Sequence, residues 1–429
     1  MNAAGRLFMD VSYTRTQHGS VGVTRTVRRL LESLQESALL TELTCQPVVI
    51  HSRGFSELPQ STVLPSATIP PKAANSIAAH TLRWAAKGRL RSVALSFLPV
   101  HWLHAAWRLY TRWTFDTLSR HAPTIEFKVG DVLLLCDASW HYEAWDAAQK
   151  ARHQGARVIL MVYDLIPLRH PEFCAQLVSC VFRRWLAEMV SASDAVVCIS
   201  AAVEEDLRDY AKMTGLPLPQ TGHFRLGCDP IREVDSGNSV RPLIANFLDT
   251  PVACFAAVGS FELRKNYAWL LHAFEQMWAK GNNIRLLIVG RPTTDGQTLI
   301  NKMKQHPEQG HKLLTVFDAH DTELAYVYEK CRALLFPSLA EGFGLPLVEA
   351  RTRGCHVIAS NLPIFLELKD EGVSLYQQNS FKELETLVME HGKIDRPAPK
   401  TAMTTFTWND SAKDLLRVID QLLEEPWKT

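Results

Sequence analysis

LLFPSLAEGFGLPLVEARTRG, residues 334–354, is the stretch that decides the fold class of this chain. It runs from an apolar segment through a glycine-containing loop with Glu341 into a helical pattern that carries Glu349. Pro346 stands where this helix would begin, and proline is favoured in a first helical turn. An apolar run, a glycine loop and a helix in this order predict a strand–loop–helix unit of an α/β domain.

The same succession of apolar run and helical pattern recurs along most of the chain. In the C-terminal half the strand-like runs occupy residues 252–260, 285–291, 312–318, 332–338, 356–360 and 373–377. In the N-terminal half they occupy residues 6–13, 43–50, 131–137, 156–164 and 194–200. Repeated alternation predicts parallel sheets covered by helices on both faces. We therefore expect an α/β fold with two tandem Rossmann-like domains and a cleft between them, where small-molecule sites are favoured.

Length and composition agree with a globular protein of more than one domain. With 429 residues the chain exceeds an ordinary single core, and it is 47% hydrophobic and 21% charged. Its formal net charge of +1 gives no general attraction to nucleic acid. Nine scattered cysteines without a CxxC pair predict buried, reduced thiols and a cytoplasmic location. We expect neither a signal peptide nor a membrane span, because no run reaches the roughly 20 apolar residues that a span needs.

Residues 72–121 interrupt the alternation with a basic and aromatic segment. It carries eight Lys or Arg residues against one acid, and four of the eleven tryptophans of the chain. Two interpretations stay open. The segment is either an amphipathic element that lies on an anionic membrane surface, or a helical insert that packs on the N-terminal domain with a solvated basic face. No RNA-binding motif accompanies it.

Glu341 and Glu349 are the first candidate ligand-binding pair. Glu341 is expected in the loop after a strand, and Glu349 in the first turns of the following helix. A carboxylate can accept hydrogen bonds from two neighbouring sugar hydroxyls, and the free amides at a helix start can bind a phosphate. The pair would therefore suit a nucleotide sugar. The alternative is that both are ordinary solvated charges.

Arg264 and Lys265 form a second candidate site. They follow the strand-like run 252–258 and Gly259, just before a helical pattern that begins near Asn266. Two adjacent cations after the carboxyl end of a strand can neutralise a diphosphate, the arginine by a bidentate contact and the lysine as a point charge. A basic pair alone is more often a surface feature, but together with the glutamate pair it favours a nucleotide diphosphate at one sheet edge.

These motifs resemble a known family. SLAEGFGLPLVEA is similar to the E-x7-E motif of the family-four retaining glycosyltransferases with the GT-B fold. VGSFELRKN resembles their donor-diphosphate loop, as found in a mannosyltransferase-like bacterial branch. SVGVTRTVRRLLESL, VYDLIPLRHPEFC, SASDAVVCISAAVEEDL and FTWNDSAKDLLRVI resemble further family segments. The similarity covers nearly the whole chain except roughly residues 52–128.

The resemblance implies donor-binding roles for residues of the two motifs. Glu349 would hold the ribose hydroxyls, and Glu341 would contact the transferred sugar. Arg264 and Lys265 would stabilise the negative charge on the departing diphosphate, so that no metal ion and no other cofactor is expected. The remaining donor-binding candidates are Gly342, Phe343, Gly344, Leu345, Gly259, Gly22 and Gly19.

The acceptor side departs from the family pattern. Tyr163 occupies a position that is often histidine in the family, and it cannot act as a base at neutral pH as an imidazole can. Asp164 is a candidate to orient or deprotonate the acceptor, although a buried structural role is an open alternative. Ser260 stands where many members carry an arginine, which Arg264 could replace.

The resemblance also implies the domain limits. Residues 1–235 would form the acceptor-side domain and residues 250–405 the nucleotide-sugar domain. Residues 406–429 would form a helix that crosses back to the N-terminal domain, and the polar stretch 231–250 is a candidate linker.

The implied activity is retaining transfer of a hexosyl unit to a lipid-linked oligosaccharide of a bacterial O-antigen, capsule or exopolysaccharide. Mannose from GDP-mannose is expected first, and rhamnose or another deoxyhexose next. The protein would work in the cytoplasm, and on the inner face of the membrane if residues 72–121 bind its surface. A non-catalytic scaffold that binds sugar nucleotides is an alternative. A dinucleotide-dependent oxidoreductase is disfavoured, because HGSVGVTRT lacks the G-x-G-x-x-G fingerprint.

Overall fold

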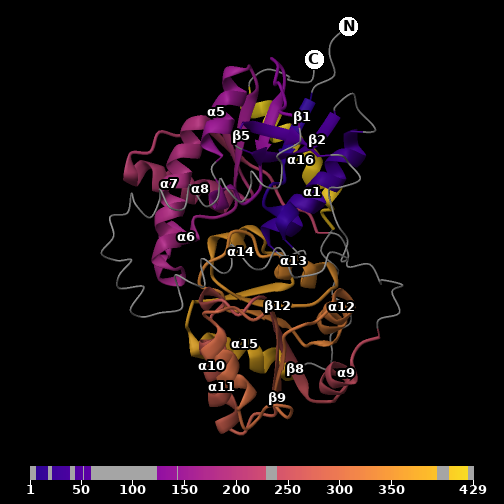
Figure 1. The fold of residues 1–429 in the computed structure, drawn as a ribbon. Helices are drawn as coiled ribbons and strands as arrows, with labels where there is room; N and C mark the ends of the chain where they lie inside the picture. Colours follow the sequence, from indigo (N-terminus) through magenta and orange to yellow (C-terminus); the bar gives the residue numbers. More distant parts are fainter. Residues whose placement is uncertain are drawn as a thin grey trace. The chain divides into compact units, whose positions relative to one another are not determined.

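The computed structural model describes residues 6–17, 22–38, 44–51, 53–58, 123–142, 144–228, 239–393 and 405–423. Gly19, the basic segment 72–121 and residues 231–238 of the expected linker lie outside these residues, whereas the rest of that stretch contains the helix Pro242–Leu248. The chain divides into two compact units (Figure 1). The first holds the described residues up to 168, residues 174–226 and the C-terminal helix, and the second holds residues 169–173 and 227–407.

The first unit is built on a seven-stranded sheet in the order β3-β2-β1-β4-β5-β6-β7. Its strands are β1 Arg6–Asp10, β2 Thr44–His51, β3 Gly54–Glu57, β4 Val132–Leu135, β5 Arg157–Val162, β6 Ala195–Cys198 and β7 Gln220–His223. All neighbours pair in parallel except β3, which runs antiparallel to β2. The predicted apolar runs became the five inner strands because these are buried. The two edge strands were missed, since β7 reads QTGH and β3 reads GFSE, and neither is an apolar run.

Helices and short 3-10 turns connect these strands. Their bounds are η1 Thr14–Thr16, α1 Val23–Ala38, η3 Ser139–His141, α5 Trp145–His153, α6 Ile166–Arg169, η4 Pro171–Phe173, α7 Gln176–Ala192 and α8 Ala201–Thr214. The C-terminal helix α16 (Trp408–Leu422) contacts α1, β6 and β7 of this unit, and Figure 1 shows it in yellow beside the indigo α1. Asp414 of α16 accepts a hydrogen bond from the Arg225 amide at 3.0 Å, which ties the helix to the segment after β7.

The second unit contains a six-stranded, entirely parallel sheet in the order β10-β9-β8-β11-β12-β13. Its strands are β8 Ala253–Val258, β9 Ile284–Val289, β10 Leu313–Val316, β11 Leu334–Phe336, β12 Val357–Ser360 and β13 Val373–Tyr376. Each predicted run of the C-terminal half overlaps one of them. The two-sheet α/β prediction is therefore confirmed.

Helices cover both faces of this second sheet. They are α9 Pro242–Leu248, η5 Leu263–Lys265, α10 Tyr267–Ala279, α11 Gln297–Lys304, α12 Asp321–Lys330, α13 Leu345–Thr352, α14 Pro363–Glu367 and α15 Phe381–Lys393. Figure 1 shows α10 and α15 on one side of the sheet, with α9 and α12 on the other. Pro346 lies in the first turn of α13, as predicted. The apolar face of α10 packs on the sheet through Leu270 and Phe274, which are fully buried.

Two sequence expectations concern the whole chain. No helix within the described residues is both long and apolar enough to cross a membrane. The nine cysteines are free thiols, and seven of them are buried, as the apolar runs around them predict.

Candidate functional site

The loops after β8 and β11 meet because these two strands are neighbours in the second sheet. The loop after β8 ends in η5, which carries Arg264 and Lys265, and the loop after β11 carries Glu341. The amide of Leu339 donates a hydrogen bond to the Arg264 carbonyl at 2.8 Å. Neighbouring parallel strands end at the same edge of a sheet, which is where ligands of such sheets bind.

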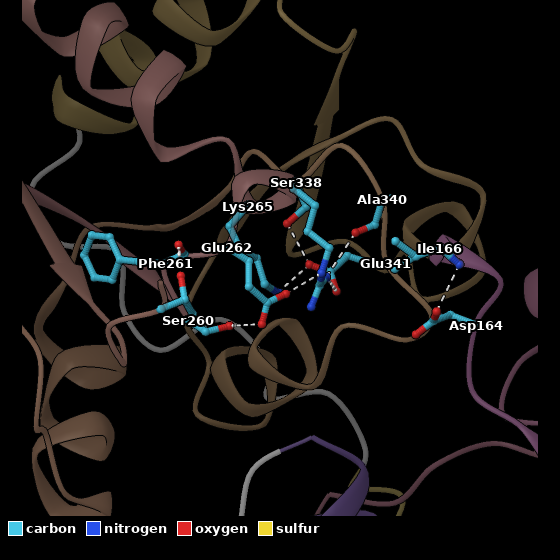
Figure 2. Close-up of polar contacts among 12 residues, drawn as sticks. Asp164, Ile166, Ser260, Phe261, Glu262, Lys265, Ser338, Ala340 and Glu341 are labelled. Atoms are coloured by element: carbon cyan, nitrogen blue, oxygen red, sulfur yellow. Dashed lines mark hydrogen bonds and ion pairs between the residues drawn. The ribbon is translucent and has the colours of Figure 1, made fainter. Parts of the chain in front are cut away.

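Glu341 is the centre of a buried ionic cluster in these loops (Figure 2). Its Oε1 accepts hydrogen bonds from Lys265 Nζ and, at 2.7 Å, from Ser338 Oγ. Its Oε2 accepts one from Arg264 Nη1 at 2.7 Å. The side chains of Glu341 and Lys265 are each only 7% exposed. The structure therefore brings together three residues that the sequence had placed in two separate motifs.

Charge within the cluster favours an ionised carboxylate. Burial alone would raise the pKa of Glu341, but the Arg264 and Lys265 cations outweigh it and lower this pKa to about 2. Burial also lowers the pKa of Lys265, and the Glu341 charge opposes that shift. The Glu341 carboxylate is thus held between two cations.

Glu262 is a further member that the sequence analysis missed. Its Oε2 accepts a hydrogen bond from Arg264 Nε at 2.7 Å, and its Oε1 accepts one from Ser260 Oγ at 2.5 Å. Arg264 is therefore gripped between Glu262 and Glu341. The position of Glu262 two residues before Arg264, in a short loop, was the signal in the sequence that the two side chains could pair. Ser260 is therefore a hydrogen-bond donor to the Glu262 carboxylate.

Two glycines allow the loop after β8 to fold back over the neighbouring strand end. Gly259 has φ +149°, and its amide donates to the Val289 carbonyl at 2.9 Å. A Cβ on Gly290 would lie 1.7 Å from the Gly259 carbonyl oxygen, so only glycine permits this approach. The Tyr267 hydroxyl also donates to that oxygen, at 3.3 Å. The close approach fixes where the Arg264–Lys265 turn begins.

Glu349 lies on α13 and is buried, with 4% of the residue exposed. Its Oε2 accepts a hydrogen bond from the Tyr328 hydroxyl of α12 at 2.8 Å. The helix begins after Gly344, which has φ +101°. A Cβ at this position would lie only 2.8 Å from the Phe365 ring, so a residue with a side chain does not fit here. Glu349 is therefore a buried carboxylate with a fixed partner and not a solvated helix residue. Nothing in the sequence indicated that Tyr328 would be this partner.

The rest of this loop also lies where the sequence placed it. Gly342 and Phe343 separate Glu341 from Gly344, and the Phe343 side chain is buried with 4% of the residue exposed. Leu345 is the first residue of α13. The chain from Glu341 to Leu345 therefore joins the ionic cluster to the helix that carries Glu349.

The predicted residues of the first unit have local roles in the structure. Tyr163, at the end of β5, donates its hydroxyl to the Cys136 carbonyl at 2.6 Å, and burial raises its pKa well above the usual value. Asp164 accepts a hydrogen bond from the Ile166 amide at 3.0 Å, at the start of α6 (Figure 2). Gly22, with φ +55°, precedes α1, and its carbonyl accepts from the amides of Arg25 and Thr26.

Within the described part of the chain, no group of three or more His, Cys, Asp or Glu side chains could hold a metal ion. Arg264 and Lys265 are the cations that pair with Glu341.

Comparison with known proteins defines the class of the second unit. Residues 245–392 match the family model of the glycosyl transferases group 1, and this part of the chain is therefore a group 1 glycosyltransferase domain. The sucrose-phosphate synthase of Thermosynechococcus elongatus has a similar structure, with a TM-score of 0.60 and 15% identity over 98% of this chain and 99% of that one. A trehalose-phosphate synthase of Burkholderia xenovorans is also similar in structure, with a TM-score of 0.62 and 14% identity over 98% of this chain and 100% of that one. The fold is thus the GT-B architecture, as predicted.

The particular relatives are mannosyltransferases. The serotype-specific mannosyltransferase WbdA of Escherichia coli is 30% identical over 326 residues, which are 71% of this chain. This match spans only 40% of the length of that relative. The O-antigen chain mannosyltransferase RfbU of Salmonella typhimurium is 23% identical over 89% of this chain and 90% of its own. The predicted resemblance to a mannosyltransferase-like bacterial branch is confirmed.

The low pKa of Glu341 predicts a dependence of stability on pH. A carboxyl group whose pKa is lower in the folded than in the unfolded state stabilises the fold above its unfolded pKa, near 4.5, and loses this contribution as the pH falls towards 2. The full contribution is on the order of 3 kcal/mol. We expect Glu341→Gln to be less stable than the parent protein at pH 7, with a difference that shrinks towards pH 3. Urea unfolding at several pH values measures this, and a constant difference would contradict it.

Proposed function

We propose that this chain is a retaining glycosyltransferase that moves mannose from GDP-mannose to a lipid-linked glycan during O-antigen synthesis. The observation that supports it most is the buried cluster of Glu341, Arg264 and Lys265 at the carboxyl ends of β8 and β11. The group 1 domain and the mannosyltransferase relatives support the reaction class and the sugar.

The cluster would act on the departing nucleotide diphosphate. Lys265 and Arg264 would stabilise the negative charge that develops on the leaving phosphate, and such fixed charges are effective in a buried site. Glu341 holds both cations in place by hydrogen bonds, and it would accept hydrogen bonds from hydroxyls of the transferred sugar. In this scheme side chains neutralise the diphosphate, so we propose that activity persists in EDTA.

Glu349 would hold the nucleotide by accepting hydrogen bonds from its ribose hydroxyls. The loop amides of Gly342, Phe343 and Gly344, at the start of α13, would face the phosphates. In retaining transfer the acceptor hydroxyl attacks the anomeric carbon from the face on which the diphosphate leaves. The proton of that hydroxyl would pass to the departing phosphate oxygen, with Asp164 a candidate to orient the acceptor.

The experiment is a panel of GDP-, UDP- and dTDP-sugars added to the purified chain, followed by thermal shift and by nucleotide release with and without a glycan acceptor. We expect selective stabilisation by GDP-mannose that is lost in Glu349→Gln. Glu371→Gln, which changes an exposed glutamate in the same domain, is the control. Stabilisation without any release in the presence of acceptor would favour the scaffold, and no response to any sugar nucleotide would refute the proposal.

Tyr328→Phe is expected to weaken binding of GDP and of GDP-mannose by the same factor, about fivefold. The lost hydroxyl positions the Glu349 carboxylate, one such hydrogen bond contributes about 1 kcal/mol, and the ribose is common to both ligands. Isothermal titration measures both constants. Tyr326→Phe is the matched control, because Tyr326 lies on the same helix α12 but donates its hydroxyl to Asp249 instead of Glu349. Equal affinities in Tyr328→Phe and the parent protein would show that Glu349 does not need this contact.

A further inference from the structure

The loops after β1 and β4 in the first unit bring together a second group of polar and aromatic side chains. The proposed donor site does not include these residues. These two strands are neighbours at the centre of the sheet, and the chain continues from β1 to β2 on one side and from β4 to β5 on the other. A sheet of this kind opens a crevice outside the strand ends at such a switch point, and ligands bind there.

Two buried carboxylates fasten the loops that follow these strands to each other. Asp137, just after β4, accepts hydrogen bonds from the amide and hydroxyl of Thr14 at 2.7 and 2.9 Å. Asp10, at the end of β1, accepts one from the Tyr142 hydroxyl of the other loop. Asp10 is 0% and Asp137 1% exposed. The bonds are reciprocal, so each loop holds the other and the residues between the contacts are preorganised.

These fastened loops present three half-buried rings. Tyr13 and His141 stack with their centroids 4.4 Å apart and their planes at 9°. Trp140 lies against His141, with 5.7 Å between centroids, and packs edge-on against Trp185 at 5.3 Å. Trp185 is buried and donates to Ser139 Oγ at 2.8 Å, which anchors the loop on α7. The rings are therefore rigidly mounted and keep part of their surface open.

His141 adds an uncommitted polar group to this aromatic surface. Neither ring nitrogen bonds a partner among the described residues. Burial lowers the pKa of His141 to about 4, so its neutral imidazole offers one donor and one acceptor. The hydroxyl of Tyr163 on the neighbouring β5 is already donated to the Cys136 carbonyl. At this edge of the sheet the imidazole therefore comes from His141, in the loop after β4, and position 163 after β5 carries a tyrosine.

Asp10 and Asp137 are the buried carboxyl groups beneath these rings. Burial raises the pKa of Asp10, and burial together with the Asp10 charge raises that of Asp137 to about 7. Aromatic faces with one neutral hydrogen-bonding group suit a ligand with an apolar face and hydroxyls around it. A sugar ring has this character.

We propose that Tyr13, Trp140 and His141 form a subsite for a pyranose ring, with the ring face on the aromatic side chains and a hydroxyl on the His141 imidazole. This inference rests on the proposed glycosyltransferase function, which supplies two sources of such a ring. One is the sugar of the nucleotide donor, and the other is the terminal sugar of the acceptor. The stacked rings and the imidazole serve either, and kinetics separates them.

The test compares His141→Ala and Trp140→Leu with the parent protein and with His153→Ala, a control at an exposed histidine of α5. If the ring belongs to the acceptor, the acceptor KM rises about tenfold in both variants while the affinity for GDP-mannose stays within twofold. If it belongs to the donor, the affinity for GDP-mannose falls about tenfold while that for GDP is unchanged. Either pattern supports the subsite. An acceptor KM, kcat and donor affinity all within twofold of the parent would overturn it.

A second measurement separates this inference from the proposed function. Saturation-transfer NMR with methyl α-mannopyranoside reports binding of a free sugar ring without any transfer reaction. We expect a signal with the parent protein and with His153→Ala that is lost in His141→Ala and Trp140→Leu. If no sugar nucleotide binds yet this pattern appears, the transferase proposal fails and the subsite stands. Equal signals in all four proteins would refute the subsite, and circular dichroism confirms that each variant is folded.

Discussion

Replacing Lys265 with alanine is expected to reduce kcat/KM for mannose transfer by about 100- to 1000-fold. Its ammonium lies beside Glu341 in a buried site, where a charge that stabilises a leaving group contributes 10²–10³ in rate. Glu341 keeps Arg264 Nη1 and Ser338 Oγ as partners in the variant, so the carboxylate remains satisfied and the domain should fold. The measurement is steady-state kinetics with GDP-mannose and the glycan acceptor.

Lys369→Ala provides the matched control for this prediction. Lys369 is an exposed lysine of the same domain, and removing a surface lysine leaves the charge of the buried cluster intact. We expect its kcat/KM to stay within twofold of the parent. A Lys265→Ala variant that melts like the parent and retains a third or more of its activity would show that the lysine does not stabilise the leaving group.

Replacing Gly290 with alanine is expected to lower the free energy of unfolding by about 3 kcal/mol or more, or to prevent folding of the second unit. The added Cβ would lie 1.7 Å from the Gly259 carbonyl oxygen and 2.7 Å from its carbon, and backbone atoms cannot rotate away. Overpacking of this kind typically costs about 1–3 kcal/mol, and a contact with backbone belongs at the upper end. Urea unfolding followed by circular dichroism gives the value.

Gly392→Ala is the control for this prediction. It changes a glycine to alanine at a position where the added Cβ meets no close neighbour, so any difference from Gly290→Ala reports the steric clash. Gly392 lies in α15, and a Cβ there would meet its neighbours at 3.9 and 4.0 Å, which is ordinary contact. Alanine is the better helix former, so we expect stabilisation of up to about 1 kcal/mol. A Gly290→Ala protein within about 1 kcal/mol of the parent would mean that the loop after β8 can move, and that its position does not fix Arg264 and Lys265.

The amino-acid sequence by itself determined the fold class and named most residues of the candidate site. Alternation of apolar runs and helical patterns is a local property, so it predicted the six strands of the second sheet and the five inner strands of the first. It missed β3 and β7, because GFSE and QTGH are not apolar runs. Glu341, Glu349, Arg264 and Lys265 could be named from two short motifs, since the residues of each motif are close in the chain.

Only the tertiary structure decided how these groups meet. Strand order placed β8 beside β11, and this brought Lys265 to Glu341 across 76 residues of chain. The sequence could not show that the Tyr163 hydroxyl is used by a backbone carbonyl, nor that His141 stacks on Tyr13. The physical reason is that hydrogen bonds, ion pairs and ring contacts depend on which strand ends share a sheet edge. Local periodicity carries no information about that order.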